Sequence, residues 1–546
     1  MVLGWENVLV AKGFRPVDRG QQFLLPVSMR DWLPAGHLVW FVLDVVAELD
    51  LDGFRARHRL GGAGREAYHP GMLLALLVYA YAVGERSSRQ VERLCGTDVA
   101  FRVICAQDTP DHTTIARFRK AHAALFEDVF AQVLALCARA GMGRLATVAI
   151  DGTKIAANAS IDANHGEAWF REQARKVAAE ADAVDAAEDA EFGPDTRGDE
   201  LPPELADPAT RAERIRRCLA ELAAEQAEHD AAAAAGTAKA EAHLARIAAG
   251  RVTGRDPGAL DPVAAAQARL AREMTARQAE IDAYTAEVAA ARAEGGRLPS
   301  GRRIVDPLGG KRVKKALAAL ERALLRAAAR GETGTSKSAS GAAVARRNVT
   351  DPDSRIMPTR GGWIQGYNGQ FAVSADYLIL ALILANNPAD VAQLEPMITR
   401  AEQAAVVINQ ERDTPEATGT VLADAGYFSD RNLDPGDRPQ VFDRLIATGK
   451  SRDLARKAAD DPAAGPPPED AGPAEAMRHR LRTPDGAALH KKRGATVEPV
   501  NGHIKDRIGL RRFAMRGLTA CTGELNLAAA VHNLRRLFTT TTTQTG

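Results

Sequence analysis

Two short apolar runs that each end in aspartate constrain the fold of this chain more than any other feature. Residues 145–151 read LATVAID and residues 419–424 read GTVLAD, and a glycine follows each aspartate within two positions. Runs of this length and composition are typical of β-strands. They predict an α/β sheet with Asp151 and Asp424 at the carboxyl ends of two strands, where open sheets bind ligands. A single aspartate in such a place is more often a turn or cap residue.

A third acidic residue, Glu498, lies near the C-terminus in the stretch ATVEPVNGHIK. We interpret this stretch as the start of a helix, with Glu498 in the first turn and Pro499 where a proline costs no helical hydrogen bond. Lys505 follows seven residues later, which places both side chains on one helix face. For this pair alone, a solvated amphipathic helix is the alternative. Asp151, Asp424 and Glu498, called here the acid triad, offer three oxygen ligands for a hard cation such as Mg²⁺.

A long helical segment separates the two strand-like runs. Between about residues 167 and 330 the chain is rich in Ala, Glu and Arg, with almost no strand-forming runs. Apolar residues recur at steps of three and four, with only Arg277 interrupting the first row, which indicates helical hairpins or a short coiled coil. The two stripes are Leu270, Met274, Ile281, Tyr284 and Val288, and Val313, Leu317, Leu320 and Leu324. Because the second strand follows this segment, we expect an insertion whose role, in partner contact, DNA contact or spacing, stays open.

The charge of the chain is balanced as a whole but uneven along its length. The formal net charge is +1, whereas the stretch from Arg478 to Arg516 contains eleven Lys or Arg residues and only three acids. A basic stretch of this kind is the electrostatic footprint expected for contacts with phosphates. A solvated helical face is the alternative.

Cysteine usage and hydropathy limit the cellular compartment in which we expect the chain and argue against a membrane protein. The five cysteines form no CxxC pair, which argues against a disulfide framework and against zinc, and favours a reducing cytoplasm. The N-terminus lacks the basic-then-apolar plan of a signal peptide. The longest apolar run, residues 72–83, is too short to span a bilayer, so no membrane partner is expected.

Residues 1–140 have the pattern of a helical domain. Two short capped helices are predicted over residues 87–93 and 111–120, and Arg117 and Arg119 lie on the second. Their arrangement resembles a helix-turn-helix DNA reader. An ordinary helical bundle with exposed arginines is the alternative.

The other expected elements follow from local patterns. We predict a β-hairpin from residues 363–374 and 377–384, a helix over 388–403, a strand over 441–447 and a final helix over 525–538. Composition favours disorder over the acidic residues 181–200, the Pro/Gly/Ala-rich residues 462–473 and the Thr-rich residues 539–546, and a flexible connection over 331–343.

The three acid motifs together resemble the bacterial insertion-sequence transposases of the DDE class. VAIDGTK around Asp151 resembles the first acid motif of that family, ADAGY around Asp424 the second, and VEPVNGHIK around Glu498 the third acid with its downstream lysine. At two positions the chain departs from many relatives, with His490 in place of Tyr and Asn501 in place of Phe.

The resemblance covers roughly residues 10–165 and 345–538, and it includes residues 351–368, 432–433 and 512–518. It implies an α/β fold with an RNase H-like core, which is a mixed sheet flanked by helices, together with an all-α N-terminal domain and a long α-helical or coiled-coil insertion. The expected domains are a helical end-DNA-binding domain (1–140), a catalytic domain in two parts (141–165 and 346–538), the helical insertion (166–345) and a disordered tail (539–546).

The resemblance also implies a function. Such an enzyme cuts DNA at the ends of its element and transfers those ends into target DNA, with the acid triad holding two Mg²⁺ ions, for which Mn²⁺ can substitute. The residues expected to contact DNA are Lys505, Arg493, Arg511, Arg512, Tyr427 (by stacking on a base), Arg117 and Arg119. The implied partners are terminal inverted repeats and target DNA, with a homodimer in the synaptic complex, at the nucleoid of a bacterial cytoplasm.

Two alternatives stay open at this point. One is a metal-dependent DNA nuclease of the same fold that cuts without strand transfer, since both reactions need only the triad. The other is an inactive DNA-binding remnant of a transposase. Inverted repeats that bracket the gene would favour the transposase.

Overall fold

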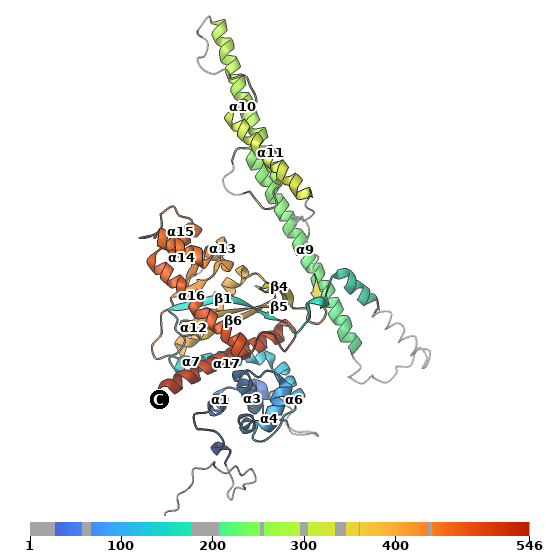
Figure 1. Cartoon of the computed structure of the whole chain (residues 1–546), viewed down its shortest axis with the longest axis vertical. Helices are drawn as coiled ribbons and strands as arrows, with labels where there is room; N and C mark the ends of the chain where they lie inside the picture. Colours follow the sequence, from blue (N-terminus) through green and yellow to red (C-terminus); the bar gives the residue numbers. More distant parts are fainter. Residues whose placement is uncertain are drawn as a thin grey trace, which may run out of the picture. The chain divides into compact units, whose positions relative to one another are not determined.

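The structure, a computed structural model (Figure 1), describes residues 28–56, 67–176, 207–251, 256–294, 297, 304–332, 346–359, 361–434, 436 and 439–544. The chain divides into two compact units, which are described separately below: unit 1 contains residues 1–161 and 353–546, and unit 2 contains residues 162–352. The acidic residues 181–200 and residues 333–343 of the expected flexible connection lie outside the described residues. The domain boundaries expected from the sequence stay a prediction.

A mixed sheet of six strands lies at the centre of the described part of unit 1. Strand β1 (Thr147–Ala156) pairs antiparallel with β5 (Gly362–Ser374) and parallel with β7 (Thr420–Ala423), which pairs parallel with β8 (Asp443–Ile446). Strands β4 (Arg355–Thr359) and β6 (Ile379–Ala385) pair antiparallel with different halves of the long β5. The predicted hairpin and the mixed sheet are thus confirmed, whereas the RNase H-like identity of the core stays a prediction.

The central strands are apolar because helices cover them. Val148, Ala149 and Ile150 of β1 are fully buried, as expected for strands without a solvent-facing side. Helix α16 (Pro484–Gly502) packs against β1, β5 and β7, and both α12 (Leu394–Gln410) and α17 (Leu518–Gln544) pack against β6. Of these helices, α16 places the segment that contains Glu498 against β1, the strand that contains Asp151 (Figure 1).

Helix α16 begins earlier than the sequence indicated. Thr483 caps its N-terminus by accepting a hydrogen bond from the Gly486 N–H, and Pro484 is the first helical residue. Glu498 therefore lies in the last part of this helix, and the prediction of a helix start at Glu498 is wrong. Pro499 lies inside the helix, where it removes one backbone hydrogen bond. Val497 and Val500 are buried on α16, which packs against the sheet, and their burial offsets that loss.

Two segments expected to be disordered have defined positions. Helix α17 continues through the Thr-rich tail to Gln544, and the Thr539 and Thr540 hydroxyls donate to the carbonyls of Arg535 and Arg536. Residues 462–472 have no regular helix or strand, yet Ala463 is buried and its N–H donates to the Arg482 carbonyl. Composition alone therefore misjudged both segments.

The N-terminal part of unit 1 is helical, as predicted. Its described helices are α1 (Leu38–Glu48), α2 (Asp52–Arg55), α3 (Pro70–Ala82), α4 (Ser88–Thr97), α5 (Val99–Ile104), α6 (His112–Ala121) and α7 (Phe126–Arg139). Ser87, Asp98 and Asp111 cap α4, α5 and α6, because each side chain accepts a hydrogen bond from a backbone N–H in the first turn. Helix α7 packs along α17, which joins this part to the sheet through one hydrophobic core.

No single helix among the described residues is long and apolar enough to cross a membrane, and only the bent pair His112–Ala121 and Ala123–Arg139, with a 61° break, meets the criteria of length and composition.

Unit 2 consists mainly of long helices in its described residues. Helix α10 (Pro262–Ala293) packs against α9 (Asp207–Ala248) and α11 (Lys311–Glu332), which confirms the predicted helical hairpins (Figure 1). The predicted stripe on α11 is correct only in part, because Val313 is buried but Leu317 and Leu324 are exposed. Unit 2 also contains a short antiparallel pair, β2 (Asn164–His165) with β3 (Arg347–Asn348).

Candidate active site

The pairing of β1 with β7 brings the first two acids together. The register ends at Ala149 opposite Leu422, two residues before Asp151 and Asp424, so the two aspartates lie at the same level on adjacent strands. Adjacent strands are roughly 5 Å apart. Asp424 follows the end of β7, as predicted, whereas β1 continues beyond Asp151 to Ala156 because β5 pairs with it along that length. Asp151 is thus a residue within its strand and not at its end.

Burial and neighbouring charge raise the pKa of Asp151 to about 6 from 3.8. Loss of water around the carboxylate is the largest cause, and the carboxylates of Asp424 and Asp390 add to it. Arg493 on α16 opposes the shift, since its Nη1 lies 3.5 Å from Asp151 Oδ2. The side chain of Asp151 is only 19% exposed, so a positive charge placed beside it would be strongly favoured.

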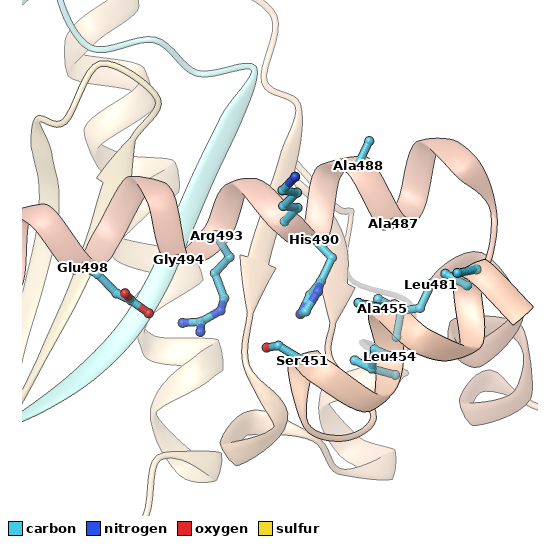
Figure 2. Close-up of a pocket in the computed structure, with 13 residues that line it drawn as sticks. Ser451, Leu454, Ala455, Leu481, Ala487, Ala488, His490, Arg493, Gly494 and Glu498 are labelled. Carbon is cyan, nitrogen blue, oxygen red and sulfur yellow. The ribbon is translucent and has the colours of Figure 1, made fainter.

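Glu498 lies on the helix that packs against β1 but does not complete a cation site. A Cβ atom added to Gly494 would lie 3.2 Å from Glu498 Oε1, so the carboxylate runs back along α16 towards Arg493. Figure 2 shows the side chains of Glu498 and Arg493 leaving α16 on the same side. Among the described residues, no three His, Cys, Asp or Glu side chains are close enough together to hold a metal ion. The structure therefore brings together two members of the triad and places the third nearby.

Lys505 lies near Asp151, but in a local backbone conformation that differs from the predicted one. It lies in a π-helical turn, η6 (His503–Arg507), and not two α-helical turns after Glu498. Burial lowers the pKa of the Lys505 ammonium, and so do the positive charges of Arg511 and Lys154, while Asp506 and Asp151 raise it. The interaction with Asp151 places this cation within electrostatic range of the paired acids.

The basic turn after η6 is attached to the end of β1. The Ala156 N–H donates to the Arg511 carbonyl, and the Phe513 N–H donates to the Ala156 carbonyl. The side chains of Arg511 and Arg512 are exposed, and Arg511 forms an ion pair with Asp506. Both guanidinium groups are therefore accessible beside the strand that contains Asp151.

A cavity of about 640 Å³ opens between α16 and α14 (Ser451–Asp460), next to Glu498. Its walls are mainly alanine and leucine, and its polar end contains His490, Arg493 and Glu498 (Figure 2). His490 Nε2 is buried without a hydrogen-bond partner in the described structure, and burial together with Arg493 lowers the pKa of this imidazole. The His490 that replaces the Tyr of many relatives is thus a neutral group at the edge of the candidate site.

Two residues predicted to contact DNA are in the interior. Tyr427 is fully buried and its hydroxyl donates to Gln370, so it has no face available to a base. Arg119 is buried, and its guanidinium donates to the Tyr81 hydroxyl at 3.3 Å and to the Arg86 carbonyl at 3.0 Å. These two assignments are wrong for this conformation, whereas Arg117 is exposed.

The raised pKa of Asp151 predicts a specific pH dependence of stability in metal-free protein. A carboxyl with a raised folded-state pKa stabilises the protein below pH 3.8, and this contribution is lost as the pH rises to about 6. Asn does not titrate, so Asp151→Asn abolishes this pH-dependent loss of stability. The free energy of unfolding of the mutant minus that of wild type should therefore increase by about 2 kcal/mol between pH 4.5 and pH 7. Urea unfolding of both proteins at the two pH values measures the difference. An unchanged difference would contradict the buried position of Asp151.

Comparison with known families provides two matches. A family model described as "Transposase domain (DUF772)" matches residues 27–121, and one described as "Transposase DDE domain" matches residues 468–538. The second range contains Arg493, Glu498 and Lys505 but neither aspartate. No curated protein and no solved structure matches the chain.

Proposed function

Because the two family matches identify the chain as a DDE-class insertion-sequence transposase, we propose that it cuts DNA at the ends of its element and joins those ends to target DNA. The observation that supports this most is the register of β1 and β7, which sets Asp151 beside Asp424 on a mixed sheet. We further propose that this sheet is an RNase H-like core, with Glu498 as the third acid.

The chemistry of the donor groups in the triad suits a divalent cation. The triad offers only carboxylate oxygens, which are the ligands that Mg²⁺ prefers. Burial is the main cause of the raised pKa of Asp151, and the neighbouring Asp424 carboxylate adds to it. A shared cation would offset both the burial cost and the repulsion between the two carboxylates. When bound, Mg²⁺ would supply Lewis-acid stabilisation of the attacking and leaving oxygens at a phosphodiester. Glu498 would complete the ligand set from α16.

The basic residues around the triad would hold the DNA. Lys505 and Arg493, both within range of Asp151, are placed to neutralise the phosphate next to the cleaved bond. Arg511 and Arg512 would contact the adjacent backbone from the turn beside β1. The exposed Arg117 would contribute to binding of the terminal inverted repeats by the N-terminal helices. The same proposal places the protein at bacterial nucleoid DNA, as a homodimer when two ends are paired.

The test is a cleavage and joining assay with purified protein and linear DNA that carries the inverted repeats of the element. Wild type is expected to cut the ends and join them to a plasmid with Mg²⁺, and Glu498→Gln is expected to bind the ends without cutting. Glu475→Gln is the matched control, because Glu475 is exposed on α15 (Pro473–Arg480).

Other outcomes separate the alternatives. Cutting without joining would favour a nuclease, and end binding without cutting by wild type would favour an inactive remnant. Equal cutting by wild type and Glu498→Gln would overturn the role of Glu498.

A further inference from the structure

A partly buried polar network lies on the opposite face of β1 from Asp151. Side chains alternate along a strand, so Gly152 and Lys154 face away from the side that Asp151 faces. Their cross-strand partners on β5 are Gln370 and Asn368. The donors on this face therefore come from both strands of the antiparallel pair β1 and β5.

One carboxylate oxygen of Asp390 accepts hydrogen bonds from these donors. Asp390 immediately precedes the turn η4 (Val391–Gln393), and its Oδ1 accepts hydrogen bonds from Lys154 Nζ at 3.2 Å, Asn368 Nδ2 at 2.7 Å and Gln370 Nε2 at 2.8 Å. Lys154 also donates to the Pro388 carbonyl at 2.8 Å. A carboxylate oxygen with three donors, one of them charged, is strongly fixed in position.

The same network reaches the second acid. Asp424 caps the turn η5 (Ala425–Tyr427), and the Tyr427 hydroxyl at the end of that turn donates to Gln370. Asn432 fastens η5 to η4, because its Nδ2 donates to the Tyr427 carbonyl at 2.7 Å and to the Val391 carbonyl at 2.8 Å. The turn after Asp424 is thus tied to Asp390 by two independent routes.

The glycines of the two acid motifs are explained by this arrangement. A Cβ atom on Gly152 would lie 2.4 Å from Gln370 Nε2 and 2.6 Å from Asp390 Oδ1, so any side chain there would displace the network. A Cβ atom on Gly426 would lie 3.0 Å from Asp424 Oδ1 and 3.4 Å from Asp390 Oδ2. The side chain of Asp390 therefore occupies the space that both glycines leave free.

We propose that Asp390 is a positioning residue that holds Asp151 and Asp424 at the spacing required to share a cation. It acts through Lys154, Asn368 and Gln370 on the β1 side and through Gln370 and Tyr427 on the η5 side. This inference rests on the proposed function, because it assigns Asp390 to the site at which cleavage would occur. Residues that orient metal ligands in this way typically affect metal affinity or activity by about 10–100-fold.

The experiment measures Mn²⁺ binding by titration calorimetry and end cleavage under single-turnover conditions for the full-length protein. Asp390→Asn should weaken Mn²⁺ binding about tenfold and slow cleavage by about 10–100-fold, while end-DNA binding stays unchanged. Gly152→Ala, which displaces Asp390 without removing it, should give the same pattern. Asp413→Asn, an exposed aspartate in the loop before β7, is the matched control.

Each result has a distinct meaning. Weaker Mn²⁺ binding by Asp390→Asn, measured at a temperature where circular dichroism shows both proteins folded, would support the inference even if wild type did not cut DNA. In that case the proposed function alone would fail. Equal Mn²⁺ binding by wild type and Asp390→Asn would overturn the inference even if cleavage occurred. Absence of Mn²⁺ binding by wild type would overturn the inference together with the cation site.

Discussion

Asp424→Asn is expected to lower metal-dependent cleavage of end DNA by about a thousandfold or more. The substitution removes one of two adjacent carboxylates, and losing several kcal/mol of metal-mediated stabilisation corresponds to about this change in rate. The fold should persist, because Asn can still accept the hydrogen bond that Asp424 Oδ1 accepts from the Gly426 N–H at 2.8 Å. Single-turnover cleavage in Mg²⁺, measured beside circular dichroism, checks both statements.

The exposed Asp434, in the segment that follows η5, provides the matched control Asp434→Asn. This substitution should leave the cleavage rate within about twofold of wild type, because surface substitutions away from a site change little. Cleavage by Asp424→Asn at the wild-type rate would exclude Asp424 from the catalytic site and would remove the main support for a shared cation.

Glu524→Ala is expected to lower the free energy of unfolding by about 3–5 kcal/mol. Glu524 is fully buried on α17 and forms an ion pair with Arg86 at 2.5 Å. It also accepts hydrogen bonds from the Tyr81 hydroxyl at 3.1 Å and from the Ala514 N–H at 2.9 Å. Removing one member of a buried pair leaves the other charge without compensation, which is the source of the large cost.

Equilibrium urea unfolding measures this effect, and Glu127→Ala is the control. Glu127 forms an exposed ion pair with Arg400 at 2.9 Å, so its loss should cost less than about 1 kcal/mol. Similar losses for the two variants would mean that Glu524 is hydrated in solution and that the buried pair does not contribute as described.

The Glu524 pair also bears on the site. Arg86, in the loop between α3 and α4, donates to the Gly509 carbonyl at 2.6 Å and to the Arg512 carbonyl at 2.7 Å. The N-terminal helices therefore hold the backbone of the turn that presents Arg511 and Arg512. Loss of Glu524 would loosen this turn as well as the core.

The predictions that depended on short runs of sequence were the most accurate. The apolar runs before Asp151 and Asp424 form neighbouring parallel strands, and the hairpin after residue 363 forms as expected. Periodic apolar residues likewise located α10 and α11. These features were readable because burial on both faces of a strand, or on one stripe of a helix, requires a local pattern.

The wrong predictions concern sequence patterns that are compatible with two different local structures. Pro499 is compatible with a helix start, but Thr483 and Pro484 provide the start of α16. Packing of α16 on the sheet stabilises the helix although Pro499 lies in its interior. Burial of Leu534 and Leu537 in the core stabilises α17 up to the start of the Thr-rich tail. The tail then continues the same helix to Gln544. Propensity is a weak signal where tertiary packing opposes it.

The sequence by itself determined where the two strands that precede Asp151 and Asp424, the hairpin and the long helices form, and it indicated which acids to propose as cation ligands. Only the tertiary structure decided which polar residues lie around those acids. It buried Tyr427 and Arg119, which the sequence placed on DNA, and it brought Asp390 and Lys154 into one network from segments more than 230 residues apart. The physical reason is that residue type specifies which hydrogen bonds and charges are possible, whereas strand register and helix packing specify which groups meet.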